Sequence, residues 1–363
     1  MEKNKVLVAM SGGVDSTLAV YLLKKQGFDV SGVTMSIWGG EFNVSSGKKG
    51  GCYSPDEKYA ISRANKLAKK LGIKHVTVDL KKEYKKNVLD YFCSEYLCGK
   101  TPNPCTVCNS KIKFGFLIDK AKKGGLKFDY FATGHYVRIA FDKKTGRFLL
   151  KKGKDALKDQ SYFLWRLKQN RLKQLMFPLG NLTKKEVKNL ACKIGLKQLA
   201  KQSESQDFID RKYHEGLFVG KKIKSGYICD SKGKILAAHK GIIHYTIGQR
   251  KGLGIGGTKE PIYVTNILPK ENKIIVGSKK DLFSKELTAG DLNWIAVKKL
   301  EKPVKVKAKI RLQHKEQECV VSPFNKGKVK VVFKKPQMAI TPGQSVVFYK
   351  GTAVFGGGVI EKL

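Results

Sequence analysis

The chain has 363 residues, of which 41% are hydrophobic and 28% are charged, and its formal net charge is +42. This composition excludes a disordered acidic protein and supplies enough apolar material for the cores of about two or three domains. The 72 Lys and Arg against 30 Asp and Glu favour a polyanionic partner such as a nucleic acid. Few of the basic residues are arginine, so a coding bias that spreads lysine over solvated surfaces is the alternative explanation.

The first part of the chain alternates predicted strands and helices. We expect strands over 6–9, 29–38, 74–80 and 129–133. We expect helices over 17–25, 55–71, 83–98 and 109–123, a mobile loop over 39–51 and a proline-containing loop over 99–107. Alternation of this kind is typical of an α/β fold in which helices cover both faces of a parallel sheet.

The pattern changes after a further predicted helix over 181–194. Short strands interrupted by glycine, over 225–240 and 244–267, predict a small central β-rich domain. From residue 273 onward the apolar residues alternate at period two, which predicts a C-terminal antiparallel β-barrel. We therefore expect domains over 1–210, 211–277 and 278–363.

Targeting signals and cysteine usage bear on location. No apolar run approaches the ~18–20 residues of a membrane-spanning helix. The first residues, MEKNK, lead directly into a strand, so we predict a cytoplasmic protein with no membrane association. The 8 cysteines should then be reduced thiols.

The most informative motif is SGGVDS, residues 11–16, between the first predicted strand and the first predicted helix. Its glycines allow a close approach of the backbone to an anion, and the amides at the start of the helix face that anion. The hydroxyls of Ser11 and Ser16 can donate to phosphate oxygens, while Asp15 can hold Mg²⁺ or orient the loop. The motif lacks the lysine of a Walker A loop. A glycine-rich turn with a helix cap is the alternative.

The second motif is TPNPCTVCN, residues 101–109, which presents Cys105 and Cys108 as C-x-x-C just before a predicted helix. A helix N-terminus, with Lys111 and Lys113 nearby, should lower the pKa of such a thiol and make it a nucleophile. Buried packing cysteines are the alternative, and a four-cysteine zinc site would need a second C-x-x-C that the sequence lacks. The remaining cysteines have no matching motif and should tolerate serine: Cys52, Cys93, Cys98, Cys192, Cys229 and Cys319.

Together with further segments, these motifs resemble the tRNA-specific 2-thiouridylase family over the whole chain. The further segments are ATGHY at 132–136, KDQSYFL at 158–164, HYTIGQRKGLGIGG at 244–257 and TPGQSVVFYKGTAVFGGGVI at 341–360. SGGVDS resembles the pyrophosphate loop of enzymes that split ATP between its α and β phosphates. The resemblance implies an ATP-binding catalytic domain of the adenine-nucleotide α-hydrolase type, followed by the central domain and a barrel that binds tRNA.

The resemblance also implies roles for individual residues. Those that would contact ATP, with Mg²⁺, are Ala9, Met10, Ser11, Gly12, Gly13, Val14, Asp15, Ser16, Met35 and Gly134. Those that would contact the target base or tRNA are Asn103, Pro104, Cys105, His135, Lys158, Asp159, Gln160, Arg311, Leu312 and Gln344. Cys108 would be the first catalytic cysteine.

The implied reaction adenylates the 2-oxygen of the wobble uridine in the anticodon stem-loop and then replaces that oxygen with sulfur, releasing AMP and pyrophosphate. A cysteine desulfurase, a relay protein or free sulfide would supply the sulfur. We expect the enzyme to be a monomer.

Two positions depart from the family pattern. Many members have Asp where this chain has Cys105, and the partner cysteine that carries the persulfide corresponds here to Asp207, just before Phe208. A persulfide-and-disulfide route gives each position its own role, so this exchange should harm it. A shared metal centre needs only convergent ligands, which favours an iron–sulfur cluster held by Cys105, Cys108 and Asp207. A surface carboxylate at position 207 is the alternative, and no metal ligand set is certain.

Two other classes of function remain open. An amidotransferase-type ligase shares the pyrophosphate loop but needs no C-x-x-C before a helix, so dependence on thiols separates it. A tRNA-binding protein with ATP as a structural ligand would release no pyrophosphate.

Overall fold

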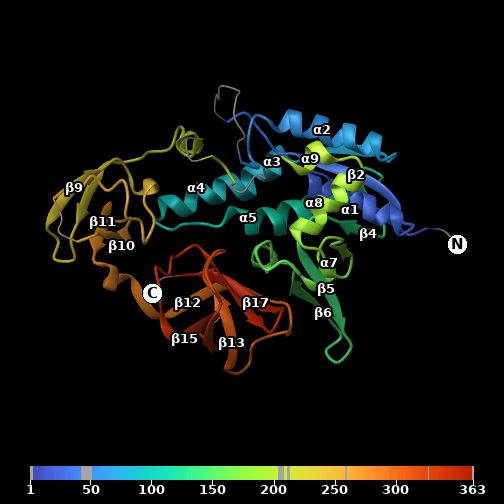
Figure 1. Cartoon of the computed structure of the whole chain (residues 1–363). Coiled ribbons are helices and arrows are strands. Elements are labelled where there is room, and N and C mark those ends of the chain that lie inside the picture. Colours follow the sequence, from blue (N-terminus) through green and yellow to red (C-terminus); the bar gives the residue numbers. More distant parts are fainter. Residues whose placement is uncertain are drawn as a thin grey trace.

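The computed structural model describes residues 3–41, 51–202, 208–210, 213–257, 260–325 and 327–361. Figure 1 shows a parallel sheet with its helices, a group of short central strands and a C-terminal barrel that lies against the sheet domain. The fold class expected from the sequence, α/β with a β-rich middle and a terminal barrel, is confirmed. Most of the loop expected to be mobile, namely 42–50, lies outside the described residues. Within the described ranges no helix is long and apolar enough to cross a membrane.

The N-terminal sheet contains, among the described residues, five parallel strands in the order β3-β2-β1-β4-β7. Their bounds are β1 (Lys5–Ala9), β2 (Asp29–Ser36), β3 (His75–Asp79), β4 (Tyr130–Ala132) and β7 (Leu175–Met176). Because β1 is central, with β2 on one side and β4 on the other, its carboxyl end adjoins the position where an open α/β sheet binds a nucleotide.

Both faces of this sheet are covered, as its apolar strands require. Val6 and Val8 of β1 pack with Ala19 and Ala64 from α1 (Val14–Lys25) and α2 (Glu57–Lys70). Leu7 points to the opposite face and joins the main core. The helices on that side are α3 (Lys81–Tyr84), α4 (Asp90–Leu97), α5 (Pro104–Val107) and α6 (Leu117–Lys123), with π-helical turns η1 (Lys85–Leu89) and η2 (Cys108–Phe116).

The prediction of a loop over 99–107 is wrong for its last four residues, which form α5. Asn103 is the N-cap of this helix, its side chain accepts from the Thr106 amide at 3.4 Å, and Pro104 occupies the first turn. Proline suits that position because its fixed φ matches the helix and its missing N–H would have had no partner there. Cys105 therefore lies inside a helix, and Cys108 begins the π-helical turn that continues it.

A hairpin joins the N-terminal part of the chain to the barrel, and the sequence analysis did not identify it. Its strands are β5 (Val137–Asp142) and β6 (Arg147–Lys152). Lys151 of β6 pairs with Ala353 of the last barrel strand. In the described chain the barrel closes with six strands in the order β12-β15-β14-β13-β16-β17, and β12 pairs back to β17. Their bounds are β12 (Phe283–Trp294), β13 (Val304–Lys309), β14 (Gln317–Phe324), β15 (Lys328–Met338), β16 (Ser345–Lys350) and β17 (Ala353–Ile360).

The central strands form a separate small sheet, ordered β10-β11-β8-β9. Their bounds are β8 (Gly226–Cys229), β9 (Ile235–His239), β10 (Tyr263–Leu268) and β11 (Lys273–Gly277). Short helices complete the catalytic part: α7 (Gln169–Leu172), α8 (Lys184–Lys193) and α9 (Lys197–Ala200). Helix α8 begins with a capping box between Thr183 and Glu186, which confirms the helix expected there.

The barrel contacts the loop before α5 through backbone groups. The Thr101 amide donates to the Pro342 carbonyl at 2.9 Å, and the Gln344 side chain donates to the Thr101 carbonyl at 2.8 Å. Gly343 lies between these contacts with φ +89, and a Cβ added there would lie 2.9 Å from the Thr101 oxygen. Only glycine therefore fits this junction without displacing the loop.

We predict that Gly343→Ala lowers the free energy of unfolding by about 2–4 kcal/mol, because it adds a backbone clash to the cost of a positive φ. The matched control is Gly351→Ala, which has φ +59 but no atom within 4 Å of the added Cβ. The control should lose about 1–2 kcal/mol. Denaturant unfolding of both variants measures the difference, and equal losses would contradict a clash at the junction.

Candidate active site

The loop between β1 and α1 approaches its neighbours closely. Gly12 has φ +71, and a Cβ at this position would lie 2.8 Å from the Ala60 carbonyl oxygen. Within the loop the Ser11 amide donates to the Ser16 hydroxyl at 3.2 Å. No side chain of the described residues caps α1, whose N-cap is Gly13, so its first amides face the space beyond the sheet. An anionic ligand fits such a helix terminus.

The other residues expected at ATP lie at the same edge of the sheet. Met35 is near the carboxyl end of β2, and Gly134 follows β4. A Cβ on Gly134 would lie 2.8 Å from the Asp15 carbonyl carbon and 2.9 Å from the Ser16 nitrogen. The structure therefore brings the segment after β4 directly against the loop after β1, and the residues present fit a phosphate group.

Asp15 belongs to an ion pair that the sequence did not reveal. The Lys184 ammonium lies 2.7 Å from Asp15 Oδ1 and 2.9 Å from Oδ2, and the Tyr136 hydroxyl donates to Oδ1 at 2.8 Å. The Lys184 side chain is only 10% exposed. Of the two roles considered for Asp15, this geometry supports orienting the loop, since the carboxylate is already neutralised.

Two further side chains position these loops and were missed by sequence reasoning. Arg63 of α2 donates through Nε to the Gly12 carbonyl at 2.8 Å. Glu57, at the start of α2, accepts from the amides of Ile37 and Trp38, which follow β2. Neither residue belongs to a motif, and a long-range contact of this kind leaves no local pattern.

Cys105 and Cys108 are half-buried and pack against the main core. Burial raises the pKa of Cys108 to about 11, Lys113 opposes this shift, and the nearby Cys52 thiol adds to it. The expectation of a lowered pKa is therefore wrong for Cys108. The reason is desolvation, together with the fact that the Lys113 ammonium donates to Asn109 Oδ1 at 3.1 Å.

Cys52, which is expected to tolerate serine, is exposed and adjoins a core residue. Its neighbour Tyr53 is fully buried, and the Tyr53 amide donates to the Phe208 carbonyl at 3.0 Å. Tyr53 also stacks on Tyr84, with ring centroids 5.3 Å apart. Burial raises the pKa of Tyr84 well above its usual value, and Cys108, Cys52 and Cys105 each add to this shift. All three thiols are therefore near the same phenol.

The residues expected to contact the target base or the tRNA differ in their burial and in their hydrogen bonds. Burial holds the pKa of His135 well below its usual value, and Lys113 acts in the same direction, so this imidazole is neutral at pH 7. Asp159 accepts from the Ser161 amide and hydroxyl, and Gln160 Oε1 accepts from the Tyr136 amide at 2.9 Å. Lys158 is half-buried. Gln160 thus shapes the segment that follows Gly134, while Asp159 accepts from the Gly153 amide and within its own loop.

Of the three barrel residues of this set, Gln344 lies at the loop before α5. Gln344 donates to the carbonyls of Thr101 and Pro102, beside Asn103 and Pro104. Arg311 donates to the Met338 carbonyl at 3.0 Å. Leu312 is 39% exposed. The structure therefore places Gln344 at the same loop as the residues expected at the target base.

Asp207 lies outside the described residues. Within the described part of the chain, no group of three His, Cys, Asp or Glu side chains could hold a metal ion. Cys105 and Cys108 are soft ligands of the right chemistry for iron, but the described residues do not complete a cluster site. An iron–sulfur centre is therefore not supported by these residues, and no step is derived through one.

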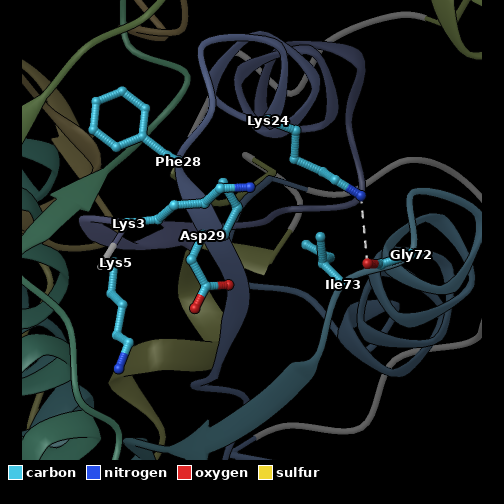
Figure 2. Close-up of a pocket in the computed structure, with 8 residues that line it drawn as sticks. Lys3, Lys5, Lys24, Phe28, Asp29, Gly72 and Ile73 are labelled. Carbon is cyan, nitrogen blue, oxygen red and sulfur yellow. Dashed lines mark hydrogen bonds between the residues drawn. The ribbon is translucent and has the colours of Figure 1, made fainter. Parts of the chain in front are cut away.

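A surface hollow of about 420 Å³ lies at the opposite edge of the sheet (Figure 2). Lys3, Lys5, Lys24 and Asp29 line it, and the Lys24 ammonium reaches the Gly72 carbonyl. Because β1 and β2 begin here, this hollow is separated from the loop at 11–16 by the length of the strands. It is not part of the candidate site.

Comparison with known proteins assigns the chain to a family. Residues 4–210 match the tRNA methyl transferase HUP domain family, residues 217–278 match the tRNA methyl transferase PRC-barrel domain, and residues 284–360 match the aminomethyltransferase beta-barrel domain. The protein named tRNA-specific 2-thiouridylase MnmA 2 of Thermoanaerobacter sp. (strain X514) is 50% identical over 99% of this chain and 98% of its own length. The chain belongs to the tRNA-specific 2-thiouridylase family.

Other members of this family are similarly close. The tRNA-specific 2-thiouridylase MnmA of Acetivibrio thermocellus is 47% identical over 99% of this chain and 100% of its own length. The protein of the same name from Endomicrobium trichonymphae is 48% identical over 98% of each chain. The resemblance read from the motifs is confirmed.

We predict that Asp15→Ala lowers the free energy of unfolding by about 2–3 kcal/mol, because it leaves the Lys184 ammonium half-desolvated without its partner. Adding Lys184→Met should restore part of the loss. Asp90→Ala is the matched control, since the Asp90–Lys85 pair is exposed on both sides and should change stability by about 0–1 kcal/mol. If Asp15→Ala unfolds at the same denaturant concentration as the control, the ion pair does not hold the loop.

We predict that Cys108 alkylates slowly at neutral pH. With a pKa of about 11, its thiolate fraction at pH 7 is about 10⁻⁴, so its rate should rise about tenfold per pH unit toward that value. Iodoacetamide labelling followed by peptide mass spectrometry measures each cysteine separately, and the exposed Cys98 serves as the accessibility reference. A Cys108 rate that is flat between neutral and alkaline pH would show that burial does not control this thiol.

Proposed function

We propose that this protein carries out the ATP-dependent 2-thiolation of the wobble uridine of tRNA. The observation that carries the proposal is a chain of contacts from the phosphate loop to the thiols. Gly134 abuts Asp15, His135 follows Gly134, and the His135 ring packs on Phe114 of η2, the turn that begins at Cys108, with ring centroids 5.7 Å apart. An activated base held at this edge of the sheet would therefore be close to Cys108.

In the first half-reaction ATP is a substrate. Amides at the start of α1 and the loop at 11–16 hold its phosphates, and Asp15 is held in place by Lys184. The uridine leaves its stack, which costs a few kcal/mol and less in a single-stranded loop. Its 2-oxygen attacks the α-phosphorus, and pyrophosphate leaves. Mg²⁺ would screen the phosphate charges when it is bound.

In the second half-reaction Cys108 carries the sulfur as a persulfide. The terminal sulfur attacks carbon 2 of the uridine, and the carbon–oxygen bond breaks with release of AMP. The Cys105 thiolate then attacks Cys108 Sγ, which forms a Cys105–Cys108 disulfide and releases the 2-thiouridine with its electron pair. An external dithiol reduces this disulfide before the next turnover. The C-x-x-C spacing on one helix suits such a pair.

The cluster alternative stays testable. If Asp207 completes an iron site with Cys105 and Cys108, anaerobically purified protein should contain iron and labile sulfide, and Asp207→Ala should lose both. Protein that thiolates tRNA without iron supports the persulfide route.

The remaining expectations extend this proposal. We assign tRNA contact to His135, Lys158, Arg311 and Leu312 and to their neighbours Asp159, Gln160 and Gln344, with the barrel holding the stem. A cysteine desulfurase or a relay protein supplies persulfide sulfur, and free sulfide would instead open the Cys105–Cys108 disulfide left by turnover to give the Cys108 persulfide and the Cys105 thiolate. We further propose that the enzyme acts as a cytoplasmic monomer, with domains over 1–210, 211–277 and 278–363.

We predict that incubation with tRNA, a sulfur source and α-labelled ATP yields AMP, pyrophosphate and thiolated tRNA. Cys108→Ser should keep pyrophosphate release and lose 2-thiouridine, because the phosphate loop and the thiols lie on different elements. Cys192→Ser, an exposed cysteine of α8, is the matched control and should keep both. ADP as the sole nucleotide product, or normal thiolation by Cys108→Ser, would contradict the proposed chemistry.

A further inference from the structure

The sulfur-transfer site, as proposed above, has an access problem. Cys105 and Cys108 are half-buried, and Cys108 packs against the main core. A protein that delivers a persulfide must bring its own sulfur into contact with the acceptor thiol, since the exchange is a direct displacement at sulfur. A half-buried thiol is less accessible than an exposed one to a sulfur that is still attached to another protein.

Cys52 has the properties that the buried pair lacks. It is exposed, whereas the adjacent Tyr53 and Ser54 are buried. Tyr53 is held on several sides: its amide donates to the Phe208 carbonyl at 3.0 Å, and its ring stacks on Tyr84 and on Phe208. Cys52 is thus an accessible thiol on a fixed segment.

The same anchoring ties the Cys52 segment to the core against which Cys105 and Cys108 pack, because Tyr53 belongs to that core. Tyr53 stacks on Tyr84 of α3, and α3 packs against η2, the turn that begins at Cys108. Glu57, which accepts from the Ile37 amide just after β2, also raises the pKa of Tyr84 through its charge. The segment that carries the exposed thiol therefore packs, through Tyr84, against the part of the chain that carries the half-buried pair.

We propose that Cys52 is the entry thiol for sulfur, which accepts a persulfide sulfur from a donor protein and passes it to Cys108. This inference rests on the proposed function. The donor R–S–SH reacts with the Cys52 thiolate to give Cys52–S–SH and R–S⁻. The Cys108 sulfur then attacks the terminal sulfur, the bond to Cys52 Sγ breaks, and the Cys108 proton passes to the departing Cys52 sulfur. Neither exchange requires an oxidant or a reductant.

The first test compares two sulfur sources for the same variant. With a cysteine desulfurase and L-cysteine as the donor, Cys52→Ser should form 2-thiouridine at least about tenfold more slowly than the unmodified chain. Free sulfide should rescue it, because sulfide can open the Cys105–Cys108 disulfide left by turnover, which gives the Cys108 persulfide and the Cys105 thiolate without the entry thiol. Cys98→Ser and Cys192→Ser, both exposed in the structure, are matched controls and should match the unmodified chain with either source.

The second test traps the sulfur in transit. In Cys108→Ser supplied with a desulfurase and ³⁵S-labelled L-cysteine, the label should remain on the peptide that contains Cys52. Label that appears instead on Cys105, or on no cysteine, overturns the proposal, as does full desulfurase-dependent activity of Cys52→Ser. The unmodified chain distinguishes failure of the proposed function from failure of the entry-thiol inference. If it forms no 2-thiouridine with either source, the proposed function fails and the inference fails with it. If it does while Cys52→Ser keeps pace, the inference alone fails.

Discussion

The short segment before α5 is the constraint on which the site depends. Its Thr101 amide and carbonyl bond to Pro342 and Gln344 of the barrel, and its hydroxyl donates to Thr246 of the central part at 3.1 Å. Asn103 then caps α5 and fixes the direction in which the helix leaves. Because Cys105 and Cys108 follow within that helix and its π-helical continuation, parts of the chain far apart in sequence together position the thiols.

Sequence reasoning predicted the parallel sheet and the barrel because each rests on a local pattern. Apolar runs followed by turn residues indicated β1 and β4, and a helical pattern over 181–194, with Thr183 near its start, indicated α8. The β5–β6 hairpin was missed because its alternation is weak and its partner is a strand some two hundred residues later. The start of α5 was missed because two prolines in TPNPC indicate a loop, although the second of them begins a helix.

The candidate site was predicted in part for the same reason. SGGVDS and the C-x-x-C pair are contiguous, so their residue types can be read directly. The Lys184 partner of Asp15, the raised pKa of Cys108 and the place of Cys52 depend on burial and on contacts between distant segments. Charge patterning could not reveal the buried lysine, since lysine is abundant throughout this chain.

The β5–β6 hairpin also bears on how the chain is made. The main core of the catalytic part contains Ile295, Val347, Tyr349 and Val354, which come from the barrel segment at the end of the chain. A chain emerging from the ribosome, at about 5–20 residues per second, exposes β6 and the core around Trp165 well before these residues exist. The N-terminal part therefore completes its core only after the last barrel strand has been made, and a chain truncated before that strand would present an unpaired edge suited to aggregation.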